Sequence, residues 1–151
     1  MRDLDGQVLR VFTSAGGANG KDSWSWSEDY VYGPAGLLAS ETPQGRHRFH
    51  LDHLGTPRLV TDGNGLELGL HHYYPFGEEA TLASQDAERL KFTGHERDML
   101  SGNITNGDSF DYMHARTYAP LLGRFISPDP LGGNPLAPQS WNRYAYVAMI
   151  P

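Results

Sequence analysis

Apolar and polar residues alternate along most of this chain, and short turn segments interrupt them at regular intervals. Residues 7–13 and 23–27 alternate so that every second side chain points to the same face of a β-strand. One stretch, residues 84–90, favours a helix, because Ser84 can serve as its N-cap and acidic residues follow in the first turn. The pattern predicts a mainly β protein of antiparallel hairpins with at most one short helix.

The strongest hairpin signal lies near the middle of the chain. Residues 58–61 and 66–68 are strand-like and flank the segment Asp62-Gly63-Asn64-Gly65. Asp-Gly and Asn-Gly pairs tolerate the positive φ angles that tight β-turns require. We therefore expect an antiparallel ladder between these two strands. A further strand is expected at residues 141–147.

A loose internal repeat accompanies the turns. Gly36, Gly55 and Gly77 each follow an aromatic residue or a histidine and a turn, and they are 19 and 22 residues apart. This period suits one hairpin per repeat, in which each hairpin covers the apolar face that its neighbour leaves exposed. The repeat predicts a stacked β-sheet.

The composition of the chain excludes several classes of structure and function. Gly and Pro make up 28 of 151 residues, which leaves little room for long helices, and the size fits one modest domain. The chain has no cysteine, so disulfides, thiolate nucleophiles and zinc-thiolate sites are excluded. A net charge of −6 without a basic cluster makes nucleic acid an unexpected partner. We expect no membrane span and no signal peptide at the first residues, and therefore a soluble chain.

Six ordered motifs in this sequence resemble the RHS repeat-associated core, and the resemblance covers about residues 30–147. The motifs are HLDHLGTPRLVTD at 50–62, YYPFGE at 73–78, FTGHERD at 92–98, Ala115-Arg116 with Tyr118 and Pro120, LGRFISPDP at 122–130, and NRYAYV at 142–147. The chain then divides into N-terminal strands with a Gly-rich loop (1–29), the resembling core (30–147) and a tail outside the motifs (148–151).

The resemblance implies a structural function. Cores of this kind close the C-terminal end of long YD-repeat chains, in which a β-sheet spiral forms a hollow shell around a toxin. It therefore implies a part of a bacterial polymorphic-toxin shell, secreted or at the cell surface, whose partner is a C-terminal toxin. The family usually continues after Tyr-Val with Asn-Asn-Pro, whereas this chain has Ala148-Met149-Ile150-Pro151, which truncation or fusion explains best.

The resemblance also bears on Asp129. Family cores often cleave themselves with a pair of aspartates that act like an aspartic protease, and Asp129 lies in the matching Asp-Pro dipeptide. One carboxylate of such a pair acts as base and the other as acid. Residues 130–151 contain no further Asp or Glu, so we expect an incomplete cleavage unit in which Asp129 caps a turn before Pro130.

The histidines offer an alternative function. His50, Asp52 and His53 precede the central hairpin, and His71 and His72 follow it. On a strand, His50 and Asp52 would point to one face, and a histidine of the returning strand would meet them. Two imidazoles and a carboxylate suit a divalent metal such as zinc, whose bound water would hydrolyse activated esters or phosphoesters. In the competing interpretation, His50, Asp52 and His53 serve the hairpin's own hydrogen bonds.

Either function leaves open sheet edges, which predicts a homo-oligomer. In the run His95-Glu96-Arg97-Asp98, we expect Arg97 and Asp98 to fix a turn by charge-assisted hydrogen bonds rather than to form a catalytic group.

Overall fold

The computed structural model describes residues 1–15, 22–81, 88–99 and 109–147. The chain divides into two compact units, Met1–Leu70 and His71–Pro151. The elements in the described residues are ten β-strands and three short 3-10 helices. This confirms the mainly β fold. Most of the expected helix at 84–90 lies outside the described residues, and residues 88–90 are not helical.

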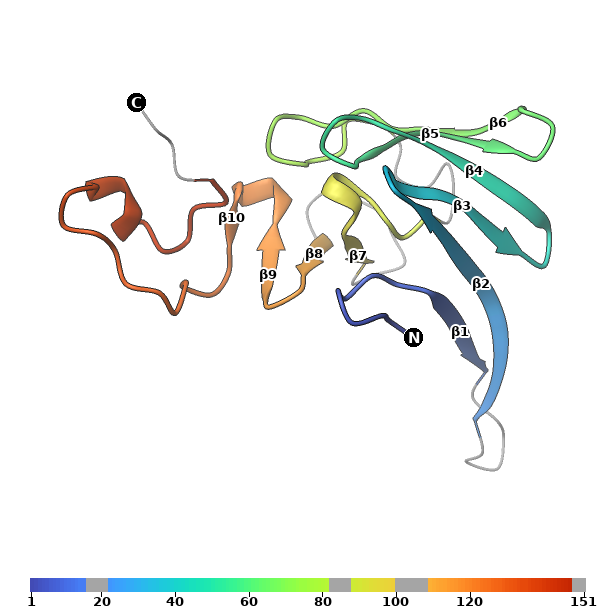
Figure 1. Ribbon diagram of the computed structural model, residues 1–151, viewed down its shortest axis with the longest axis horizontal. Helices are drawn as coiled ribbons and strands as arrows, with labels where there is room; N and C mark the ends of the chain where they lie inside the picture. Colours follow the sequence, from blue (N-terminus) through green and yellow to red (C-terminus); the bar gives the residue numbers. More distant parts are fainter. Residues whose placement is uncertain (16–21, 82–87, 100–108, 148–151) are drawn as a thin grey trace. The chain divides into compact units, whose positions relative to one another are not determined.

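The N-terminal unit contains a six-stranded antiparallel sheet. Its strands are β1 (Arg10–Ala15), β2 (Ser23–Gly33), β3 (Gly36–Thr42), β4 (Gly45–Leu51), β5 (Pro57–Asp62) and β6 (Glu67–Leu70). Each strand pairs with the next along the chain, as the blue-to-green ribbon in Figure 1 shows. The expected ladder on either side of residues 62–65 is the β5–β6 pair.

Cross-strand pairs on one face of this sheet form the core of the N-terminal unit. Phe49 of β4 lies opposite Val60 of β5, and both side chains are buried. The ring of Tyr30 in β2 lies 6.4 Å from that of Phe49, measured between centroids. In β4 the buried Phe49 lies between the exposed Arg48 and His50, as expected for a strand with one covered face.

A single turn type recurs through both units. Its first residue receives a hydrogen bond from the glycine three positions later and donates its own N–H to the carbonyl four positions later, with N···O distances of 2.8–3.3 Å. The first residues are Asp3, Asp52, Asp62, Tyr74 and Lys91, and the glycines are Gly6, Gly55, Gly65, Gly77 and Gly94, with φ between 71° and 88°. Such turns end in a left-handed residue that forms a β-bulge, which favours glycine. Two glycines of the predicted repeat, Gly55 and Gly77, belong to this class.

Gly36 differs from the other two glycines of the predicted repeat. It pairs with Gly33 across a two-residue turn and adopts a φ of 111°. The physical basis of the repeat is therefore the recurring turn described above, and the repeat contains more members than the sequence spacing suggested.

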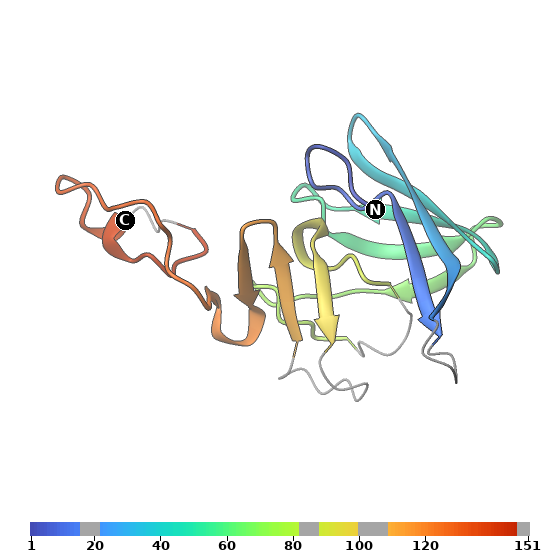
Figure 2. The same ribbon diagram turned by 90° about the horizontal axis from the view of Figure 1, so that it is seen from below.

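The C-terminal unit contains a four-stranded antiparallel sheet. The strands are β7 (Glu96–Met99), β8 (Ser109–Met113), β9 (Arg116–Ala119) and β10 (Arg124–Phe125), in the order β10-β9-β8-β7. Figure 2 shows β7, β8 and β9 side by side in yellow to orange. The short helices are η1 (Phe92–Gly94), η2 (Pro120–Leu122) and η3 (Pro138–Trp141). The expected strand at 141–147 is wrong, because this segment contributes one isolated bridge, Arg124 to Ala145.

Aromatic rings dominate the core of the C-terminal unit. Phe92, Met113, Tyr118 and Phe125 are buried together, and Tyr73 and Tyr146 pack against them. The fully buried Tyr118 donates its hydroxyl to the carbonyl of Phe76 at 2.8 Å. Burial raises the pKa of Tyr118 to about 12, which keeps the phenol protonated at neutral pH.

Candidate functional site

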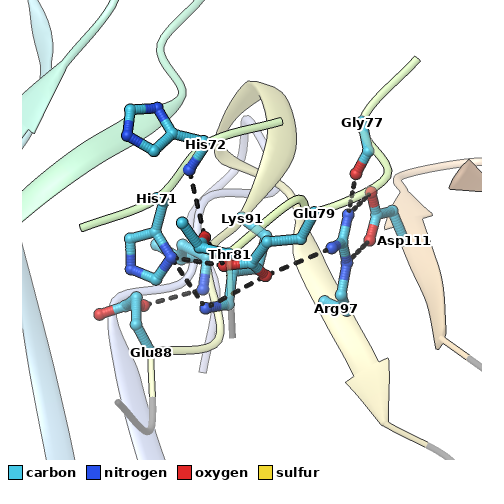
Figure 3. A network of polar contacts seen from close by, with 10 residues as sticks. His71, His72, Gly77, Glu79, Thr81, Glu88, Lys91, Arg97 and Asp111 are labelled. Carbon is cyan, nitrogen blue, oxygen red and sulfur yellow. Dashed lines mark hydrogen bonds and ion pairs between the residues drawn. The ribbon is translucent and has the colours of Figure 1, made fainter. Parts of the chain in front are cut away.

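A group of buried titratable side chains lies inside the C-terminal unit. We call it the buried charge network, and Figure 3 shows its members. They are His71, Glu79, Lys91, Arg97 and Asp111, each at most 5% exposed. Buried charges are stable only when they are paired and hydrogen-bonded. The partners of each side chain in the network therefore indicate what that side chain does.

Arg97 and Asp111 form the strongest contact in the network. They are register partners on β7 and β8. Arg97 donates two hydrogen bonds to the Asp111 carboxylate, Nε to Oδ1 at 2.6 Å and Nη2 to Oδ2 at 2.9 Å. Nη2 also donates to the carbonyl of Gly77 at 2.9 Å. The guanidinium thus joins two strands and a turn (Figure 3).

Glu79 is the centre of the other half of the network. Its Oε1 lies 2.6 Å from His71 Nδ1 and accepts a hydrogen bond from the Thr81 hydroxyl at 3.2 Å. Its Oε2 has no hydrogen-bond partner and lies 3.8 Å from Lys91 Nζ and 3.7 Å from Arg97 Nη1. Because a carboxylate can only accept, His71 Nδ1 carries the proton of the short bond. Lys91 Nζ lies 3.5 Å from the same His71 Nδ1, which cannot accept a hydrogen bond while it carries this proton, so Lys91 acts on the pair through its charge.

Opposite charges are paired within the network. Glu79 and Asp111 oppose Lys91 and Arg97, while His71 is neutral when it carries a single ring proton. Burial raises the pKa of Glu79, but the His71 hydrogen bond and the nearby cations overcome this and hold it below the usual value. Burial raises the pKa of Asp111, and Arg97 offsets this only in part. A fall in pH therefore reduces the contribution of Glu79 to stability and increases that of Asp111.

The side chain of Asp52 lies in a turn rather than on a strand. Strand β4 ends at Leu51, and Asp52 begins the recurring turn. Its carboxylate accepts hydrogen bonds from the Leu54 and Thr56 amides at 2.9 and 3.0 Å and from Arg58 Nε at 2.8 Å. Although burial opposes it, these bonds lower the pKa of Asp52. All of these contacts stabilise the hairpin, as the competing interpretation expected.

The histidines of the predicted metal set have separate surroundings. His50 is exposed on β4, and its Nε2 lies 3.3 Å from the Thr61 hydroxyl. His53 is exposed in the turn that Asp52 begins, and His72 is exposed next to the buried His71. No three His, Asp or Glu side chains in the described ranges form a group suited to a metal ion. Metal binding by this set remains a prediction.

Asp129 lies in the turn that the sequence predicted. Its Oδ1 accepts a hydrogen bond from the Leu131 amide at 2.9 Å, across Pro130. Its Oδ2 lies 3.2 Å from Arg116 Nη2. Its backbone N–H donates to the Arg143 carbonyl, and Arg143 Nε donates to the Asp129 carbonyl. The turn-capping role is confirmed. A catalytic role of Asp129 remains a prediction.

The expected Arg97–Asp98 pair is wrong, because Arg97 bonds to Asp111 instead. Successive residues of a strand point to opposite faces, so Arg97 faces the interior whereas Asp98 is exposed. The sequence held a signal for this network. Asp111 alternates in phase with the apolar Met113, which marks it as an inward-facing charge that needs a buried partner.

Comparison with known proteins gives relatives that include bacterial toxins. The tRNA3(Ser)-specific nuclease WapA of Bacillus spizizenii is 29% identical over 124 residues, which are 80% of this chain and 5% of WapA. The toxin protein Tse5 of Pseudomonas aeruginosa is 33% identical over 105 residues, 68% of this chain and 7% of Tse5. Salivary gland surface protein 1 of Aedes aegypti is 32% identical over 105 residues, 68% of this chain and 3% of that protein.

These relatives are much longer than the chain, which spans between 3% and 7% of their length. No protein-family model matches the sequence. Among solved structures, the crystal structure of TcdB2-TccC3 without its hypervariable C-terminal region aligns with 95% of this chain and 8% of its own, with a TM-score of 0.60 and 20% identity. The fold of the chain therefore occurs within a much larger protein chain. No helix in the described residues is long and apolar enough to cross a membrane.

Proposed function

We propose that this chain is a segment of an RHS-type core, which forms part of the β-sheet wall of a polymorphic-toxin shell and has no catalytic activity of its own. In this role the hairpins continue the wall, and the shell encloses a toxin supplied by the C-terminal part of a longer protein. Support comes from the toxin relatives, from the fold shared with TcdB2-TccC3, and from the succession of identical turns.

The observation that carries the proposal is the burial of the charge network. Catalytic acids and bases must reach a substrate, usually in a cleft. Here the carboxylates of Glu79 and Asp111 are at most 2% exposed, and their contacts are with the neighbouring strands and turns. Such groups stabilise one arrangement of strands, which suits a wall segment.

The hydrolase alternative receives no support from the described residues. Its central carboxylate, Asp52, already accepts three hydrogen bonds within its own hairpin. Its histidines belong to different strands and turns, and His71 is fully buried against Glu79. Because Asp129 caps its turn, we propose that this core lacks complete self-cleavage machinery.

One experiment separates the two functions in the isolated chain. Purified protein is assayed for metal content and for turnover of nitrophenyl acetate and nitrophenyl phosphate, with and without added Zn²⁺. The scaffold proposal predicts no turnover above that of buffer with the same metal. Turnover that the substitutions His50→Ala and Asp52→Ala both remove would establish the hydrolase instead. Light scattering on the same sample tests the predicted homo-oligomer.

A graft tests the wall function directly. This chain replaces the aligned segment of TcdB2-TccC3, and assembly of the chimera is followed by size-exclusion chromatography. We expect the chimera to elute as an assembled complex. A matched graft with Arg97→Leu should not assemble, because Asp111 is then buried without a partner. An unassembled chimera whose grafted segment is nevertheless folded, as shown by protease resistance, would contradict the proposal.

A further inference from the structure

Two histidines outside the predicted metal set lie against each other in the C-terminal unit. His95 follows helix η1, and His114 is in the turn between β8 and β9. Their ring centroids are 5.1 Å apart, and the ring planes are inclined at 84°. His114 is exposed and His95 is half-buried, so solvent ions can reach the pair.

The separation of the rings fits a shared metal ion. A histidine nitrogen binds zinc at about 2.0–2.1 Å, and the ring centroid lies about 1.2 Å further along the same direction. Two imidazoles at a tetrahedral angle around one ion therefore have centroids about 5 Å apart. The observed 5.1 Å matches this value. In an edge-to-face pair one ring must turn about its χ2 axis to aim a nitrogen at the common point, and this torsion is soft.

The backbone at His114 gives an independent indication. Met113 pairs with Arg116, so His114 and Ala115 form a two-residue turn, and His114 has a φ of 54°. Turns of this kind favour glycine where φ is positive, because a side chain is strained there. Glycine would meet the backbone requirement of this turn, so the hairpin itself does not require a histidine here. Backbone strain of this kind clusters at binding sites.

We propose that His95 and His114 bind a divalent transition-metal ion of the zinc and copper class. Imidazole nitrogen suits Zn²⁺, Ni²⁺ and Cu²⁺, and Cu²⁺ binds most tightly. Each ring needs one nitrogen for the ion and can keep a hydrogen bond through the other. Water completes the coordination, because the protein supplies two ligands. The bound ion ties the end of η1 to the β8–β9 turn, independently of the wall function.

Calorimetric titration of the untagged chain with ZnCl₂ tests the site. We expect one ion per chain, and at least a tenfold loss of affinity in both His114→Gly and His95→Gln. His114→Gly should fold at least as well as the parent, because glycine accepts the positive φ. Zinc should raise the thermal unfolding midpoint of the parent chain but not that of His114→Gly. With Cu²⁺, the electron paramagnetic resonance spectrum should show two nitrogen ligands.

Matched controls separate this pair from the set predicted from the sequence. His53→Ala and His72→Ala remove exposed histidines of that set and should leave zinc affinity unchanged. The proposal is overturned if the parent chain does not bind zinc at about 1 mM, a concentration that detects very weak sites. It is also overturned if His114→Gly binds like the parent, or if His72→Ala abolishes binding.

Discussion

Arg97 and Asp111 lie directly opposite each other on β7 and β8, and both are buried at the point where two parallel hydrogen bonds join them. A shift of β7 by one residue against β8 would turn the Arg97 side chain to the face of the sheet opposite to that of Asp111. The buried ion pair therefore fixes the register of β7 against β8. In a wall built from paired hairpins, register is the property that neighbouring segments must share.

Substitution of Arg97 should strongly lower the free energy of unfolding. Arg97→Met leaves the Asp111 carboxylate buried without a partner, and we expect a loss of about 3–5 kcal/mol in the free energy of unfolding. Urea unfolding followed by near-ultraviolet circular dichroism measures it. Arg97→Met combined with Asp111→Leu should recover most of the loss, because both charges are then gone. Arg10→Met, which breaks an exposed ion pair with Asp29, should change little.

Both the backbone conformation and the packing at position 77 require glycine. Its φ is 88°, and a Cβ atom there would lie 2.5 Å from Cδ1 of the buried Phe92. Gly77→Ala should therefore destabilise the C-terminal unit by about 1–3 kcal/mol. Gly63→Ala is the matched control, since no atom lies within 4 Å of the added Cβ, and it should stay within about 0.5 kcal/mol. Equal effects of the two substitutions on the unfolding midpoint would contradict this packing.

A fall in pH should lower the free energy of unfolding, because Glu79 becomes protonated. Its folded pKa lies below the usual value, so the unfolded chain binds the proton more readily. The stabilisation is complete above about pH 4.3, the usual pKa of a glutamate, and is lost as the pH falls through the folded pKa. The raised pKa of Asp111 acts in the opposite direction and makes the decline shallower. Unfolding free energies between pH 7 and pH 3 should fall less steeply in Glu79→Gln than in the parent.

We expect Asp52 to stabilise its hairpin rather than to bind a metal ion. Asp52→Ala removes three hydrogen bonds to its own hairpin, which predicts a loss of about 1–3 kcal/mol in the free energy of unfolding. Asp52→Asn keeps an acceptor for the backbone amides and should lose less. Calorimetry with zinc provides the second readout. If either substitution weakened zinc binding while leaving stability unchanged, Asp52 would be a metal ligand instead.

Local patterns were enough to predict much of the fold. The turn at residues 62–65 and its flanking strands follow from the Asn64-Gly65 pair, which tolerates the positive φ that Gly65 adopts, and from the strand-like residues on either side. The strand expected at 141–147 was wrong because aromatic alternation does not distinguish a strand from a segment that packs an aromatic ring on the core. Tyr146 does the latter, and its ring centroid lies 4.9 Å from that of Tyr118.

The buried charge network depends on contacts that are distant in sequence. Glu79 and Lys91 are brought together by turns and strands whose register the local pattern does not determine. His95 and His114 are likewise separated by most of the β7–β8 pair. The histidine spacing favoured residues 50–53 and 71–72 because those are close in sequence, which says little about proximity in a sheet.

Electron cryomicroscopy of the TcdB2-TccC3 chimera tests the wall function most directly. The proposed wall function predicts that a chimera carrying its C-terminal region forms a closed shell with continuous density for strands β7 to β9 of the grafted segment. It also predicts that the enclosed C-terminal region is protected from added protease. A shell that closes while the grafted segment projects from it without strand density would contradict the proposed function. The same holds if the enclosed chain is digested as fast as free protein.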